Sequence, residues 1–450
     1  MSNDPRDILA RSPMSWLQIV AVAITIGLNG LDGFDVQAIS FASPGITAEW
    51  HIDKAALGIV LSMELIGMAL GSLLLGSVAD RIGRRPTMLG CLVVMVMGMY
   101  LATTASGTTD LSIWRVLTGF GIGGLLAAIN AIAMEYSNAR RRNLSVALMS
   151  IGYPLGAVLG GLVVQHLLAG SNWRSVFYFG TAITALFIPL VWLCVPESIH
   201  WLTRKQPAGA LERINRTFAR MGHAAAASLP VISAEVRKRS YSDLFRPGLI
   251  ATTICVALAY FFHIVSFYFI IKWIPQLVVD MGFKPSAAAG VLVMTNVGGA
   301  TGGAVLGLLT LRFGVKPLTI AVMLLSTLTV ALFGRSPPNL DHLKVICFCA
   351  GFCTNAGIVG MYAIFAQAFP THVRASGTGF AIGIGRGGSV LAPTVAGFLF
   401  KAGYALPGVA LIMGLSATVA AVIMMSVKLK LNQSEAESEA AAATASGASA

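Results

Sequence analysis

The sequence predicts an all-α membrane protein whose twelve spanning helices form two bundles of six. Three observations predict this fold class: the composition, the recurrence of long apolar segments, and a similarity between the two halves of the chain. Hydrophobic residues make up 56% of the 450 residues and charged residues only 11%, and the mean hydropathy is +0.77. A soluble chain of this length needs more charge to cover its surface, so an ordinary soluble protein is excluded.

Apolar segments recur along the whole chain, and each is long enough to span a bilayer. About 20 apolar residues cross the hydrocarbon core as a helix, and a helix pairs every backbone amide within the segment, as lipid requires. We expect spans at residues 16–40, 55–78, 87–106, 111–133, 144–168, 175–195, 247–272, 286–309, 317–334, 343–367, 376–400 and 405–427.

A polar segment rich in Lys and Arg separates the sixth span from the seventh. We therefore expect a first six-helix bundle over residues 1–198, a cytoplasmic central loop over 199–246 and a second bundle over 247–428. The tail, residues 429–450, is rich in Ser, Glu and Ala, which predicts a disordered cytoplasmic end.

The basic residues predict the orientation. If both termini are cytoplasmic, the loops on that side carry most of the Lys and Arg, as cytoplasmic loops generally do. This predicts a multi-pass protein with both termini on the cytoplasmic side. The net charge of +12 does not indicate a nucleic-acid partner, because the basic residues lie in short loops between apolar segments.

The two halves of the chain resemble each other at one constant offset. The segment that starts at Ser62 aligns with the segment that starts at Val293, with Gly67 opposite Gly298 and Gly71 opposite Gly302. Tandem halves of this kind are related by an axis along the membrane normal, and their solute site lies between them near the middle of the membrane.

Several motifs carry a resemblance to a known family. The segment GSVADRIGRR (76–85), with a weaker copy at 307–316, resembles the signature of the major facilitator superfamily. LDGFDVQAISFASP in the first span, RVLTGFGIGG from Arg115, PES from Pro196 and the segment from Phe369 resemble the aromatic acid:proton symporter family, although sugar and dicarboxylate porters share several of these pieces. The resemblance implies a major facilitator fold around a central cavity. It also implies proton-coupled uptake by alternating access, across a bacterial inner membrane, of an aromatic carboxylate such as a hydroxybenzoate-type acid in aromatic catabolism.

Asp32 and Asp35 are the candidate proton-coupling residues. A carboxylate inside a bilayer costs at least about 2.5 kcal/mol, so it persists where it faces a wet cavity or a partner. A spacing of three places both side chains on one helix face, and mutual repulsion favours protonation of at least one. A structural salt bridge, or a turn that breaks the helix at Gly33, is the alternative.

Arg115 and Arg386 are the candidate anion contacts. Arg115 lies at the same depth as the two aspartates, and we expect it to pair with an aspartate in the empty protein and to be redistributed by protonation. Arg386 lies near mid-membrane among glycines, where its planar guanidinium matches a carboxylate. Fixed ion pairs between helices are the alternative for both arginines.

Charges near the predicted cytoplasmic face form a candidate inner gate, which would hold the two halves together when the cavity opens outward. Solvated loop charge remains the alternative. The candidate gate residues are Asp80, Arg81, Gly83, Arg84, Glu135 and Arg142.

Glu64 and Lys272 depart from the family pattern. They could pair with each other, or Lys272 could contact Asp35 or the solute as a second substrate-binding cation; snorkelling of Lys272 to the interface is the alternative. His263 lies in an aromatic cluster of the seventh span and is a further possible cavity residue, although such clusters more often serve packing.

Two other classes of function remain open. One is an organic-anion, sugar-acid or drug transporter of the same fold, acting in uptake or in efflux, and the other is a membrane sensor that binds solute without turnover. An enzyme is not expected, because the chain has no nucleotide loop, metal motif or nucleophile elbow. We expect no cofactor apart from the proton as coupling ion, no metal, and a protein that functions as a monomer.

Overall fold

The structure is a computed structural model that describes residues 4–230, 244–246, 249–370 and 373–427. These residues form helices and their connections, and twelve of the helices are long and apolar enough to cross a membrane, as predicted. The first six are α2 (Trp16–Trp50), α3 (Lys54–Ile82), α4 (Arg84–Thr103), α5 (Thr108–Glu135), α6 (Arg142–Gly170) and α7 (Arg174–Cys194). The second six are α10 (Ile250–Asp280), α11 (Pro285–Leu309), α12 (Val315–Gly334), α13 (Leu340–Ala368), α14 (Arg374–Lys401) and α15 (Leu406–Ser426).

The first spanning helix is ten residues longer than predicted. It begins after a capping box at Ser15 and continues through Pro44 to Trp50, whereas we expected its end near Ser40. A proline is tolerated in a membrane helix where neighbouring side chains satisfy the freed backbone groups, and the Ser43 hydroxyl donates to the carbonyl of Ser40 at 2.8 Å. The helix also passes through Gly33 without a break, so the alternative of a turn there is wrong.

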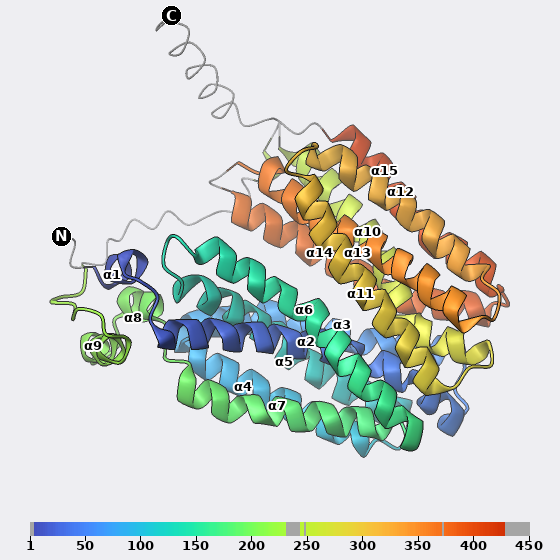
Figure 1. Ribbon diagram of the computed structural model, residues 1–450, viewed down its shortest axis with the longest axis horizontal. Coiled ribbons are helices and arrows are strands. Elements are labelled where there is room, and N and C mark those ends of the chain that lie inside the picture. Colours follow the sequence, from blue (N-terminus) through green and yellow to red (C-terminus); the bar gives the residue numbers. More distant parts are fainter. Residues whose placement is uncertain (1–3, 231–243, 247–248, 371–372, 428–450) are drawn as a thin grey trace, which may run out of the picture.

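The polar segment after α7 is not simply a loop. It contains α8 (Ile199–Lys205) and α9 (Ala210–Met221), and α9 buries Ile214, Phe218 and Met221 along one face. With α1 (Pro5–Arg11), these short helices lie at one end of the molecule, which we call the α9 end (Figure 1). We call the opposite end, where α2 finishes, the Trp50 end. Residues 231–243 of the predicted loop, and the predicted tail from 429, lie outside the described residues.

Matching glycines of the two halves make matching helix contacts. A Cβ atom added at Gly67 or Gly71 of α3 would lie 2.1 or 2.0 Å from a backbone oxygen of α5. A Cβ atom added at Gly298 or Gly302 of α11 would lie 2.0 or 2.2 Å from a backbone oxygen of α13. The repeated glycines thus permit two equivalent close approaches of helix backbones.

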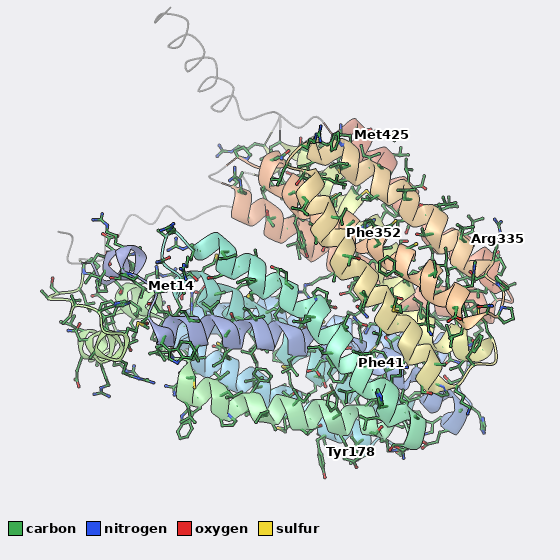
Figure 2. The ribbon with its side chains drawn as sticks, viewed as in Figure 1. Met14, Phe41, Tyr178, Arg335, Phe352 and Met425 are labelled. Atoms are coloured by element: carbon green, nitrogen blue, oxygen red, sulfur yellow. The ribbon has the colours of Figure 1, made fainter. Side chains whose placement is uncertain are left out.

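The two groups of six helices meet near the Trp50 end and diverge toward the α9 end (Figure 1). Across the meeting surface, Gln37 and Asn296 exchange two hydrogen bonds of 2.7 and 2.8 Å, and Ser62 lies 2.8 Å from Thr394. Figure 2 shows Phe41 in this region, where the groups converge. The described contacts between the groups therefore concentrate in the half of the molecule nearer to the Trp50 end.

Candidate functional site

Five ionisable side chains are buried in the membrane-spanning region beside the boundary between the two groups. Asp32 is 2% exposed, and Asp35, Glu64, Arg115 and Lys272 are fully buried. They come from α2, α3, α5 and α10. Burial of this many charged groups in a membrane is expensive unless they pair or serve a function.

Asp32 and Asp35 have different surroundings, although they lie only three positions apart on α2. Neither carboxylate makes a hydrogen bond with the described residues, and both side-chain oxygens of Asp35 are buried without a partner. Asp35 faces α7, because a Cβ atom added at Gly180 would lie 3.5 Å from its Oδ1. Asp32 interacts electrostatically with Arg386 of the other group. Because α2 is unbroken here, the spacing of three does keep both side chains on one side of the helix, as expected, and only their surroundings differ.

Arg115 does not pair with an aspartate carboxylate in this structure. Its guanidinium forms an ion pair with Glu64 and donates a 3.0 Å hydrogen bond to the backbone carbonyl of Asp35. The arginine also stacks over the ring of Phe177, with 5.4 Å to the ring centroid. The expected aspartate pairing is corrected: Glu64, on the adjacent helix α3, has taken that place and leaves the Asp35 carboxyl group unpaired.

Lys272 of α10 contacts two residues of the first group of helices. Its ammonium donates to the backbone carbonyl of Val36 and lies 3.4 Å from Glu64. The pairing of Glu64 with Lys272 was one of the predicted alternatives and is confirmed. The snorkelling alternative is wrong, since the side chain is fully buried.

Arg386 differs from the other membrane cations. It is partly exposed at the middle of α14, and its guanidinium has no hydrogen bond or ion pair with any residue that the structure describes. It acts electrostatically on Asp32 and on Tyr268. An unpaired, accessible guanidinium beside the boundary of the groups is suited to bind an anion.

A small cavity of about 20 Å³ lies between the two groups of helices, with room for about one water molecule or one hydroxyl group. Its walls combine aromatic, aliphatic and amide side chains, as is common in small-molecule sites. The residues that line it are Tyr153, Pro154, Phe267, Ile271, Thr295, Asn296, Gly299, Gly351 and Asn355.

The aromatic cluster of α10 serves mainly packing. His263 lies 2.8 Å from the carbonyl of Thr354 and is buried against α13; it is absent from the cavity lining. Tyr260 packs edge-on against Phe365. Of this cluster, Phe267 contributes to the cavity wall, so the suggestion of His263 as a cavity residue is not supported.

The predicted gate residues cluster at the α9 end, but their pairs do not join the two groups. Arg84 lies 2.9 Å from Asp80 and 3.6 Å from Glu135, and all three belong to α3, α4 and α5. Arg81 and Arg142 have no ion pair with the described residues. In this conformation the ion pairs of Arg84 lie within the first group. The link between the halves that we expect when the cavity opens outward stays a prediction.

Glu197 is a member of this cluster that our sequence reasoning did not assign. Its Oε1 accepts from the backbone N–H groups of Arg84 and Ser198, both at 2.8 Å, and so caps the start of α4. Gly83 has a φ of 112°, and a Cβ atom there would lie 2.2 Å from Glu197 Oε2. Burial raises the pKa of Glu197, although these hydrogen bonds oppose the shift. Glu197 is the central residue of the PES motif, but nothing in the sequence indicated that it contacts the start of α4.

Ion pairs between the groups occur instead at the Trp50 end. Lys54 of α3 pairs with Asp280 of α10, and Asp53, which caps α3, lies 2.9 Å from Lys401 at the end of α14. Asp53 and Lys54, which are adjacent in the chain and opposite in charge, thus each contact the second group of helices. These exposed pairs close the Trp50 end, on the side opposite to the predicted gate.

Comparison with known proteins agrees with this architecture. A profile of the Major Facilitator Superfamily matches residues 25–338 and 256–448, and the chain belongs to this superfamily of membrane transporters. It is a multi-pass transporter protein rather than an enzyme.

Its relatives are aromatic-acid transporters, as the motifs predicted. The chain is 28% identical to the gallate transporter of Pseudomonas putida over 94% of both chains. It is 30% identical to the 3-(3-hydroxy-phenyl)propionate transporter of Escherichia coli (strain K12), over 86% of this chain and 89% of the relative. The fold matches a crystal structure of a D-xylose–proton symporter with a TM-score of 0.72 at 20% identity, over 92% of this chain and 98% of the symporter chain.

Proposed function

We propose that the protein imports an aromatic carboxylate together with protons across a bacterial inner membrane by alternating access. The observation that carries this proposal is the unpaired guanidinium of Arg386, which lies at the boundary of the two helix groups within electrostatic range of the buried Asp32. The named substrates of the relatives, gallate and 3-(3-hydroxy-phenyl)propionate, favour an aromatic acid over other anions.

In this proposal the α9 end faces the cytoplasm. The basic residues of the α2–α7 group gather there, which agrees with the positive-inside rule. The contacts that close the Trp50 end then shut the periplasmic side, so the structure corresponds to an inward-facing state. We keep the two bundles at residues 1–198 and 247–428 as the units that rock against each other.

The transport cycle follows from the charges. Asp32 and Asp35 are the proton carriers, since buried carboxylates without partners are stabilised when protonated. The carboxylate of the solute binds Arg386, and its ring points toward the small cavity between the groups. Lys272 acts between the halves rather than on the solute, because its partners are Val36 and Glu64.

Uptake by purified protein in proteoliposomes tests this function. With an inward-directed proton gradient, the liposomes should accumulate radiolabelled benzoate or 4-hydroxybenzoate, and a protonophore should abolish the accumulation. Accumulation that is unchanged by the protonophore would contradict proton coupling. Export driven by the gradient would favour the efflux alternative. Binding of about one solute per protein without accumulation would indicate a sensor.

A further inference from the structure

The cavity between the groups contains two hydrogen-bonding groups that the protein leaves unused. We propose that Asn355 and Tyr153 form a subsite for a hydroxyl group on the ring of the solute, remote from the carboxylate that binds Arg386. This inference rests on the proposed function and assigns the residues that select among aromatic acids.

Four polar side chains line the cavity. Two of them already use their hydrogen-bond donors within the protein. The hydroxyl group of Thr295 donates to the carbonyl of Val291 at 3.0 Å. The amide of Asn296 exchanges hydrogen bonds with Gln37 and also donates to Leu292. The hydroxyl proton of Thr295 and both N–H groups of Asn296 are therefore in use, and neither side chain can donate to a ligand without the loss of an existing bond.

The side-chain oxygen of Asn355 is free to accept a hydrogen bond from a ligand. The Nδ2 atom of the same side chain donates a 2.6 Å hydrogen bond to the carbonyl of Gly299. Because a carbonyl oxygen can only accept, the atom that faces it has to be the amide nitrogen, and this fixes the orientation of the amide. The Oδ1 atom has no hydrogen-bond partner in the described part of the chain. Since α13 packs tightly on α11 here, with a Cβ atom at Gly299 only 3.3 Å from that of Asn355, the acceptor is also held in place.

Tyr153 supplies a group that can donate as well as accept. It comes from α6 of the other helix group and is partly buried, and its hydroxyl makes no hydrogen bond with the described residues. The cavity thus offers an acceptor from one group of helices and a hydroxyl from the other. A phenolic hydroxyl can donate to Asn355 and accept from Tyr153 at the same time.

The remaining lining residues offer apolar surface to the edge of the ring, while the cavity itself has room for its hydroxyl group. Phe267, Ile271 and Pro154 provide apolar and aromatic surface, and two glycines complete the lining. A ring without a hydroxyl would bury the Asn355 acceptor unpaired, which is unfavourable, so the cavity discriminates against it. Phe267 and Ile271 of the lining lie on α10 on either side of Tyr268 in the chain, and Arg386 acts electrostatically on Tyr268, so the subsite and the carboxylate contact share this part of α10.

Uptake kinetics of paired acids test the subsite. The ratio of kcat/KM for 4-hydroxybenzoate and 3-hydroxybenzoate to that for benzoate is measured in proteoliposomes for the wild-type protein, Asn355→Leu and Tyr153→Phe. Loss of one hydrogen bond corresponds to about a tenfold change. We expect each variant to lose about tenfold in efficiency for the better hydroxylated acid and to change little for benzoate.

The matched control is Asn130→Leu, because Asn130 is an exposed asparagine that likewise donates to a helix carbonyl. It should leave the ratio unchanged. An equal loss for benzoate and hydroxybenzoate in both variants, or an unchanged ratio, would overturn the subsite while leaving aromatic-acid transport in place. If the wild-type protein carries none of the three acids, the proposed function itself fails.

Discussion

Lys272 and Glu64 meet across the boundary between the two helix groups, with 3.4 Å between the ammonium and the carboxylate and no exposure of either side chain. Glu64 also holds Arg115 of its own group. One carboxylate therefore connects the anchored arginine of the first group to a lysine of the second. This contact lies on the closed side of the structure, so it has to break when the Trp50 end opens.

The substitution Lys272→Met should weaken the closed state at the Trp50 end. It removes the link between the groups but leaves Glu64 paired with Arg115, whereas Glu64→Gln leaves two buried cations without their carboxylate. Loss of one partner of a buried pair typically costs about 3–5 kcal/mol, so Glu64→Gln should be the more damaging change.

Spin-label distances between positions 51 and 284, both exposed at the Trp50 end, report this change. Lys272→Met should add a population with longer distances. The control is Arg216→Ala, which removes an exposed ion pair within α9. Identical distance distributions for Lys272→Met and the wild-type protein would show that the pair does not hold the two groups.

Asp32→Asn and Asp35→Asn should each abolish accumulation driven by a proton gradient. Asparagine preserves the shape of the side chain but cannot exchange a proton, and neither carboxylate has a hydrogen bond to lose. Exchange of labelled for unlabelled solute across the membrane should persist, because it needs no net proton movement. A variant that accumulates solute as the wild-type protein does would exclude that aspartate from coupling.

Arg386→Lys should raise the Kd for the aromatic acid by about tenfold or more, because an ammonium cannot reproduce the two parallel hydrogen bonds of a guanidinium to a carboxylate. Binding isotherms of the purified protein provide the measurement. Arg335→Lys makes the same exchange at an exposed position beyond α12 and should have no effect. Equal affinity in the two variants would rule out a bidentate contact at Arg386.

Gly83→Ala should destabilise the α9 end. Its φ of 112° strains any other residue, and the new Cβ atom would lie 2.2 Å from the Glu197 carboxylate that caps α4. Strain of this kind costs about 1–3 kcal/mol. Gly90→Ala, where a Cβ atom meets nothing within 4 Å, is the control. Thermal unfolding in detergent should show a lower Tm for Gly83→Ala alone; equal values would contradict this account of the capped turn.

Acidification should weaken the same region through His200. Burial, aided by the charges of Arg142 and Arg6, lowers the pKa of His200 to about 4. Because the unfolded state then binds more protons between pH 6.5 and 4, stability falls as the pH decreases through this window. The shift of about 2.5 units corresponds to at most about 3 kcal/mol.

His200→Gln should lose less stability than the wild-type protein when unfolding is measured at pH 7.5 and at pH 5. Substitution of His166, which lies on an exposed surface of α6, by Gln provides the control. A parallel loss of stability in all three proteins would assign the acid sensitivity to other groups.

The sequence by itself determined the class of fold and the inventory of membrane charges. Bilayer thickness requires apolar segments of a minimum length, and this local requirement is visible in the composition of each span. The cost of charge in lipid likewise marks Asp32, Arg115 and Arg386 without any knowledge of their neighbours.

Only the tertiary structure decided which charges pair. Arg115 binds Glu64 rather than an aspartate, and Arg84 pairs with Asp80 and Glu135 of its own group in this conformation. These choices depend on the rotation and approach of helices that are far apart in the chain, and glycine contacts such as Gly67 against α5 set that approach. Distances between side chains on different helices are not encoded in the periodicity of any single helix, so the sequence pattern could not supply them.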